Sequence, residues 1–259
     1  MKKLQMLHLV SPSPWPIVGS FSALYLVGST LLLMHGFSMG MLFAGLIILL
    51  LMFNWWADVF AESSLEGEHS KKAVGLLKAG MMLFITSEVF LFISLFWAFF
   101  HSSSSPNMEL GSIWPPQKVI PFPVDEIPLL NTIILLTSGG TLTAAHHFVL
   151  SGKKPLASMF MKMTISLGIL FTLLQAFEYL EAKFSMSDSS FGSAFFLATG
   201  FHGAHVVVGS IFLSVCLFQI DISKASYSQF IGFEASAWYW HFVDVVWLFL
   251  FVSIYWWGG

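Results

Sequence analysis

The sequence predicts an all-α integral membrane protein with seven transmembrane helices, and three observations support this fold class. First, 56% of the 259 residues are hydrophobic and only 10% are charged, whereas soluble domains average about 25% charged residues. Second, the mean hydropathy is +0.80. Third, seven apolar segments are each long enough to cross a hydrocarbon core of about 30 Å. We therefore predict a single seven-helix membrane domain over residues 1–259.

Residues typical of helix ends and membrane interfaces mark the boundaries of these segments. Prolines open the first segment, and proline is well tolerated in the first turn of a helix. Trp55 and Trp56 lie toward the end of the second segment, and tryptophan is enriched at the membrane–water interface. Five prolines between residues 106 and 123 predict an extended loop after the third segment. The predicted spans are residues 16–36, 39–60, 73–101, 128–150, 156–181, 191–218 and 234–257.

The distribution of lysine predicts the orientation of the helices. If the N-terminus lies inside, eight lysines fall in the inside loops and two in the outside loops, and such an excess is typical of the inner side of membrane proteins. An odd number of spans then places the C-terminus outside. The proline-interrupted N-terminus is predicted to be neither a signal peptide nor a transit peptide. The inside lysines are Lys2, Lys3, Lys71, Lys72, Lys78, Lys153, Lys154 and Lys224, the outside lysines are Lys118 and Lys183, and Lys162 lies early in the fifth span, nearer the inside.

Charge and cysteine content exclude two other classes of protein. The net charge of −3 indicates no nucleic-acid partner, because such partners attract basic surfaces. The single cysteine, Cys216, lies within an apolar run. Neither a disulfide framework nor a cysteine-based metal cluster is therefore expected.

Glu88 is the most informative residue, because it places a carboxyl group near the middle of the third span. A charged side chain at that depth costs at least ~2.5–3.5 kcal/mol. We expect the neutral, protonated form, since apolar surroundings disfavour a charge and the nearest lysine on the same helix, Lys78, is too far along it to pair. Only another helix or subunit could supply a cation. Two interpretations remain open: a hydrogen-bonded group that joins helices, or a carboxyl group that exchanges or tunes protons.

Histidines in the last two spans raise the question of a metal or haem site. His202 and His205 share one face of the sixth span at i, i+3 spacing, and His241 and Asp244 have the same spacing on the seventh. Neutral imidazole is the commonest metal ligand. Helical carboxylate sites, however, repeat a Glu-x-x-His pattern on two helices, and here that pattern occurs only at 66–69, in a polar loop. We predict that these four side chains make interhelical polar contacts and that the chain holds no metal or haem.

Several strings of this sequence are long enough to indicate a family. They are SPSPWPI, SEVFLFISLFWAFFHSS, PLLNTIILL, DSSFGSAFF, TGFHGAHV and GFEASAWYWHFVDVVWLFLFVSIYWW. Together they run from about residue 11 to 257 and resemble subunit III of cytochrome c oxidase, in the mitochondrial type of the aa3 haem–copper oxidases. The resemblance implies a subunit of an oxidoreductase and proton translocase that has no catalytic centre of its own. Haem a and copper would be held by partner subunits.

The same resemblance implies an arrangement and a role. The helices would form a V-shaped bundle, with helices 1 and 2 splayed from helices 3 to 7 and structural phospholipids in the cleft. The subunit would pack on the catalytic subunit I in the mitochondrial inner membrane, with its N-terminus in the matrix and its C-terminus in the intermembrane space. It would support proton uptake and turnover stability during electron transfer from cytochrome c to oxygen.

Functional positions of the family are matched by five residues of this chain. Glu88 matches the family's carbodiimide-reactive carboxyl group. The positions that line the lipid cleft or hold lipid headgroups are matched by Trp56, Glu62, His69 and Trp97.

Three positions depart from the family pattern. Ala57, Ala61 and Gln219 stand where the family usually has arginine. Arginine binds phosphate through a planar fork that alanine and glutamine cannot reproduce. Headgroup binding would then depend on Lys71, Lys72, backbone amides, the matched histidine or another subunit.

A second function class is an autonomous seven-helix proton-coupled transporter that uses Glu88 as its carboxylate. Transporters of this kind usually show internal repeats and helices broken by glycine or proline near the membrane midplane. Neither feature is found in this sequence. The oxidase subunit is therefore the favoured prediction, and the transporter is the alternative.

Overall fold

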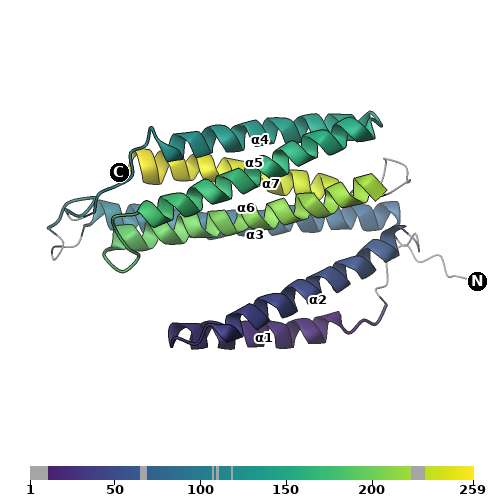
Figure 1. Ribbon diagram of the computed structural model, residues 1–259, viewed down its shortest axis with the longest axis horizontal. Coiled ribbons are helices and arrows are strands. Elements are labelled where there is room, and N and C mark those ends of the chain that lie inside the picture. Colours follow the sequence, from purple (N-terminus) through teal and green to yellow (C-terminus); the bar gives the residue numbers. More distant parts are fainter. Residues whose placement is uncertain (1–10, 65–68, 107, 109–110, 118, 223–230) are drawn as a thin grey trace, which may run out of the picture. The chain divides into compact units, whose positions relative to one another are not determined.

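The computed structural model describes residues 11–64, 69–106, 108, 111–117, 119–222 and 231–259. Within these ranges the chain forms seven α-helices and no strand, and each helix is long and apolar enough to cross a membrane (Figure 1). The predicted all-α fold with seven transmembrane helices is therefore confirmed. By its internal packing the chain divides into two compact units, Met1–Leu77 and Lys78–Gly259. Several residues of the sequence argument lie outside the described residues: Lys2, Lys3, Glu66, Lys118 and Lys224.

The helices differ from the predicted spans mainly at their ends. Their bounds are α1 Trp15–Met34, α2 Met39–Ser64, α3 Lys71–Ser104, α4 Ile127–Leu150, α5 Lys154–Glu181, α6 Ser190–Ile222 and α7 Ile231–Leu250, with a π-helical segment, η3, over Phe251–Trp256. The third and sixth helices extend past the predicted ends at 101 and 218, and the seventh begins before 234. Hydropathy marks where apolar residues stop, whereas backbone hydrogen bonding continues through the polar residues beyond them.

In the first unit, α1 and α2 form a helical hairpin with a tight connection. The N–H of Gly36 donates to the carbonyl of Leu33, and the N–H of Phe37 donates to the carbonyl of Leu32, each at 2.9 Å. This pair of bonds is a Schellman motif, and the φ of +90° at Gly36 explains why glycine suits the position. Most large apolar side chains of both helices are exposed within this unit, as expected of helices that face lipid.

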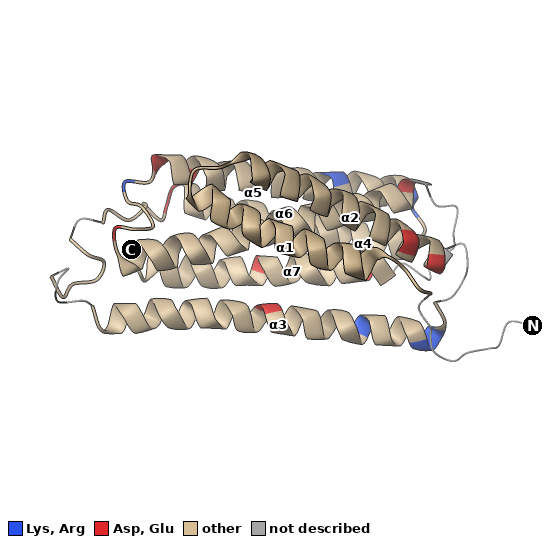
Figure 2. Ribbon diagram, turned by 90° about the horizontal axis from the view of Figure 1, so that it is seen from below, with Lys and Arg blue, Asp and Glu red and all other residues tan. Residues whose placement is uncertain are grey.

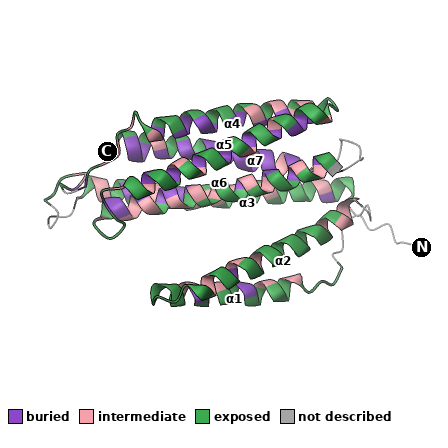
Figure 3. Cartoon of the chain, in the orientation of Figure 1, coloured by how far each residue is buried: buried purple, intermediate pink, exposed green. Residues whose placement is uncertain are grey.

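Helix α7 lies at the centre of the second unit. Of its apolar stretch, 56% is buried, the largest share among the seven helices (Figure 3). Its two fully buried tryptophans both donate to α4: Trp240 Nε1 to Ser138 Oγ and Trp247 Nε1 to Thr132 Oγ1, each at 2.9 Å. Each large apolar ring is thus buried with its polar N–H satisfied, and α7 is fixed in rotation against α4.

Two glycines let α5 and α6 approach the ring of Trp240. A Cβ atom at Gly168 would lie 2.5 Å from Cη2 of this ring, and one at Gly209 would lie 2.9 Å from Cε3. Both distances are shorter than carbon–carbon contact allows. A residue larger than glycine at either position would therefore overlap the indole ring.

The part of α3 that belongs to the second unit, from Lys78 onward, packs against α7 through aromatic rings and an ion pair. Phe84 stacks on Tyr239 at 6.2 Å between ring centroids, and Phe96 meets Phe249 edge-on at 6.3 Å. Near the start of α7, Glu234 forms an ion pair with Lys78. These large side chains reach across to α7.

Trp114, in the loop between α3 and α4, covers one end of the second unit. Its ring meets both Phe99 and Phe191 edge-on at 5.4 Å, which links the loop to α3 and α6. Phe99 also contacts Trp257 near the end of the chain. Offset and edge-on aromatic pairs of this kind each add about 0.5–1.5 kcal/mol beyond the area that they bury.

Candidate functional site

The carboxyl group of Glu88 on α3 contacts the imidazole of His205 on α6. Glu88 Oε2 lies 2.8 Å from His205 Nε2. Glu88 is the only acidic residue of α3, and the lysines of this helix lie toward its N-terminal end (Figure 2). The intramembrane carboxyl group predicted from the sequence therefore has a partner on another helix.

The contact of the second ring nitrogen, Nδ1, shows which ring nitrogen of His205 carries a hydrogen. Nδ1 is 2.6 Å from the carbonyl oxygen of Phe201, and because a carbonyl can only accept, Nδ1 carries a hydrogen. Nε2 then faces Glu88 either as the acceptor of a carboxylic O–H or as the donor of an imidazolium N–H. In both forms one proton lies between the two side chains and the pair has no net charge. The membrane interior therefore contains a neutral pair rather than an isolated carboxylate.

Aromatic side chains pack around the imidazole of this pair. The imidazole of His205 meets Phe92 edge-on at 5.2 Å, stacks on Tyr239 at 6.1 Å and meets Phe242 at 6.2 Å. The side chains of Glu88 and His205 are 21% and 12% exposed. Such surroundings have a low dielectric constant, which strengthens a hydrogen bond that is made and penalises one that is lost.

His202 makes a separate contact, although it shares a helix with His205. It is fully buried, and its Nε2 lies 3.2 Å from the carbonyl oxygen of Val243 on α7. Its ring packs against Phe171 and Trp247 at 5.5 and 5.1 Å. The polar partners of the two histidines lie on different helices, α7 for His202 and α3 for His205, so the two rings do not share one polar partner. Among the described residues, no group of three or more His, Cys, Asp or Glu side chains is arranged to hold a metal ion.

His241 and Asp244 lie within reach of each other on α7 rather than across two helices. His241 Nδ1 is 3.6 Å from Asp244 Oδ2, and the two side chains are 46% and 9% exposed. The aspartate faces Gly139 of α4, where an added Cβ would lie 2.7 Å from Oδ2. Asp244 therefore contacts α4 by packing closely against Gly139.

Gly139 and its neighbour Gly140 provide a matched test of this packing. Replacing Gly139 with alanine is expected to displace Asp244 and to lower the free energy of unfolding by about 1 kcal/mol, because the buried carboxyl group has little room to move. Nothing lies within 4 Å of a Cβ at Gly140, so alanine there should be neutral or slightly stabilising. Thermal denaturation of the purified variants measures both effects. Equal destabilisation by the two substitutions would contradict the packing role of Gly139.

Glu178 is a further carboxyl group within a transmembrane helix, and its burial was not predicted from the sequence. It is fully buried on α5, and Gln175 Nε2 donates to its Oε2 at 3.2 Å. The hydroxyl of Tyr255 lies 3.5 Å from the same amide nitrogen. Gln175 and Glu178 at i, i+3 spacing within an apolar span were the only signal in the sequence, and which side of α5 they occupy depends on packing.

The residues matched to the family's lipid positions have exposed or half-buried side chains. Trp56 is 59% exposed in the first unit, and Trp97 is 75% exposed in the second. Glu62 and His69 are half-buried in the first unit. Exposed indoles on apolar helices are typical of contact with lipid at an interface.

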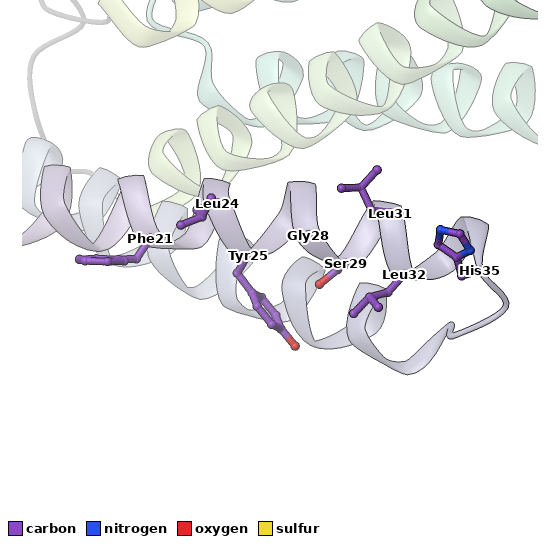
Figure 4. A pocket seen from close by; sticks show the side chains of 8 residues that line it. All are labelled: Phe21, Leu24, Tyr25, Gly28, Ser29, Leu31, Leu32 and His35. Carbon is purple, nitrogen blue, oxygen red and sulfur yellow. The ribbon is translucent and has the colours of Figure 1, made fainter.

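A shallow apolar hollow of about 640 Å³ lies on the first unit. Figure 4 labels the eight side chains that line it, which run along α1 from Phe21 to Leu32 and end at His35. None of the residues matched to the family's lipid positions lines this hollow. Its walls offer almost no polar atoms, so it fits an acyl chain better than a headgroup.

These features define a multi-pass membrane protein with polar side-chain contacts both between and within its helices. The family model described as "Cytochrome c oxidase subunit III" matches residues 5–259. The chain belongs to this family, so the predicted resemblance is confirmed.

Three relatives, each described as cytochrome c oxidase subunit 3, illustrate the similarity. The protein from Formosania lacustris is 53% identical over 254 residues, which are 97% of this chain and 97% of the relative. The protein from Triticum aestivum is 54% identical over 255 residues, 97% of this chain and 96% of the relative. That from Pelomedusa subrufa is 50% identical over 259 residues, 99% of each. Members of this family are subunits of the oxidase complex, an oxidoreductase, and carry no metal centre of their own.

Proposed function

We propose that this chain is the non-redox core subunit of cytochrome c oxidase that packs on the catalytic subunit I and stabilises it during electron transfer from cytochrome c to oxygen. Membership of the subunit III family over residues 5–259 is the observation that carries this proposal. Two polar contacts of the second unit support the packing role, because they join neighbouring helices: His202 with the Val243 carbonyl on α7, and His205 with Glu88 on α3.

Within this role, the Glu88–His205 pair supports proton uptake by the complex without being an obligatory step in it. The pair holds one proton between two side chains, so it can change from the neutral to the ionic form with no change in net charge. Moving the proton from one side chain to the other changes the electrostatic field around the pair. It does not by itself deliver a proton to another group.

The proposed lipid sites involve Trp56, Glu62, His69 and Trp97. The exposure of both indoles supports phospholipid contact at these positions. Since arginine is absent at the three departing positions, headgroup phosphates would be bound by Lys71, Lys72, His69, backbone amides or a neighbouring subunit.

We place the chain in the mitochondrial inner membrane, with its N-terminus in the matrix and its C-terminus in the intermembrane space. The lysines at the start of α3 and at the turn between α4 and α5 support this orientation, because consecutive helices bring those ends to one side of the membrane. The lysines concerned are Lys71, Lys72, Lys78, Lys153 and Lys154.

Purification of the native chain in a mild detergent tests the proposed function. We expect the chain to migrate with a haem a absorption spectrum, and we expect the isolated subunit to show neither a visible spectrum nor stoichiometric iron, copper or zinc. If the chain instead migrates without a haem a spectrum and drives proton-coupled solute uptake after reconstitution into vesicles, the transporter would be favoured. Stoichiometric metal in the isolated subunit would contradict the non-redox role.

A further inference from the structure

A hollow of about 440 Å³, lined by both charged and apolar side chains, lies between the start of α5 and the end of α6. Lys154, Ser158 and Lys162 line it from one face of α5, since residues four apart stack along a helix. Asp221 lines it from α6. We propose that this hollow binds the glycerol phosphodiester headgroup of an anionic phospholipid, of the kind found in phosphatidylglycerol and cardiolipin.

Lys162 is the residue that points to such a ligand. It is exposed, and it lies about 12 Å along α5 from the first residue of the helix, a depth at which the surroundings of a membrane helix are acyl chains. A lysine there extends its apolar stem toward the nearer interface so that its ammonium group reaches polar surroundings. The nearer interface is the end of α5 that carries Lys154.

No carboxylate among the described residues lies within ion-pair distance of the Lys162 ammonium group. Asp221 lines the same hollow, yet the two side chains form no ion pair within 4 Å. An unpaired ammonium group at the edge of the hydrocarbon is costly. The phosphate of a lipid in the adjacent leaflet is the anion available at that depth, because it lies at the level to which the side chain extends.

The charges around the hollow favour an anionic lipid over a zwitterionic one. Two lysines and one aspartate leave a net charge of +1 on the lining side chains. The backbone amides at the start of α5, where no side chain caps the helix, add a partial positive charge. Basic pockets between transmembrane helices bind anionic headgroups for this reason.

Asp221 selects among anionic headgroups. Its carboxylate repels a second phosphate placed directly beside it but accepts hydrogen bonds from hydroxyl groups. The glycerol hydroxyls of the proposed headgroup supply such donors, while the phosphodiester faces the two lysines. The hollow lies wholly in the second unit, and none of its residues belongs to the lipid sites proposed above, so this inference goes beyond the proposed function.

Lipid retention by the purified oxidase complex tests the inference. Lys162→Met keeps a long apolar side chain and removes the charge. We expect it to lose one anionic phospholipid per complex by native mass spectrometry. In nanodiscs of phosphatidylcholine with added phosphatidylglycerol or cardiolipin, we expect about fivefold weaker binding of the anionic lipid. Lys162→Arg should retain the lipid. Lys183→Met, which removes an exposed lysine beyond the opposite end of α5, is the matched control and should bind like the unmodified chain.

Asp221→Asn provides an independent arm, because it removes the negative charge that disfavours further phosphate charge beside it. It should reduce the preference for phosphatidylglycerol over phosphatidic acid, whose phosphomonoester lacks the glycerol hydroxyls. Haem a content and subunit stoichiometry show that each variant complex is assembled. Equal retention of anionic lipid by Lys162→Met and Lys183→Met would overturn the proposal. So would competition by inorganic phosphate as effective as that by phosphatidylglycerol, or crosslinking of position 162 to an acidic residue of another subunit instead of to lipid.

Discussion

Replacing His205 with leucine is expected to lower the free energy of unfolding of the second unit by about 2–3 kcal/mol, because it leaves the carboxyl group of Glu88 among aromatic rings without its hydrogen-bond partner. The loss should appear as earlier thermal release of the chain from the purified complex. Replacing Glu88 with glutamine should cost much less, since the amide N–H₂ can donate to the Nε2 lone pair of His205.

A double substitution separates the contribution of the contact to stability from the contributions of the two side chains. Glu88→Leu with His205→Leu removes both polar groups, and it should be closer to the unmodified chain in stability than His205→Leu alone. If His205→Leu proves as stable as the unmodified chain, the contact does not hold α3 to α6.

Oxygen reduction in the Glu88→Gln complex decides between the two interpretations of this carboxyl group. We expect turnover to continue, with at most altered proton pumping or faster inactivation, because glutamine keeps the shape and one hydrogen bond but cannot exchange a proton. A correctly assembled Glu88→Gln complex that lacks all turnover would show that the carboxyl group is an obligatory proton relay.

Replacing Gly168 with alanine is expected to lower the free energy of unfolding by about 2–3 kcal/mol. The new Cβ would lie 2.5 Å from Trp240 Cη2 and 2.8 Å from Ser210 Oγ. The indole cannot easily move aside, because it is fully buried and its Nε1 donates to Ser138. Either α5 must shift outward or the ring must give up that hydrogen bond, and both would be measured as a lower denaturation temperature.

Gly203 on α6 is the matched control for this substitution. Nothing lies within 4 Å of a Cβ there, so alanine should be neutral or slightly stabilising. Combining Gly168→Ala with Trp240→Phe makes room for the methyl group, and the double variant should be less destabilised than the sum of the two single variants. Strict additivity would show that Gly168 and Trp240 do not interact.

The sequence by itself determined the membrane class, the number of helices and the position of Glu88 within its span. These are local properties, because hydrocarbon thickness sets the length of an apolar segment and the run of residues around Glu88 places it near the middle. The exact ends were less well predicted, as the continuation of α3 to Ser104 and the π-helical segment after Leu250 show. Helix ends depend on backbone hydrogen bonds that hydropathy does not report.

Only the tertiary structure decided which polar groups meet. Glu88 and His205 lie on different helices, and their contact depends on how α3 and α6 are rotated against each other. The same holds for the burial of Glu178 and for the distinct surroundings of Gly139 and Gly140, two adjacent glycines of which only one faces Asp244. An apolar helix in lipid has no hydrophobic stripe to indicate its buried face, so rotation is set by close packing and by interhelical hydrogen bonds between particular side chains.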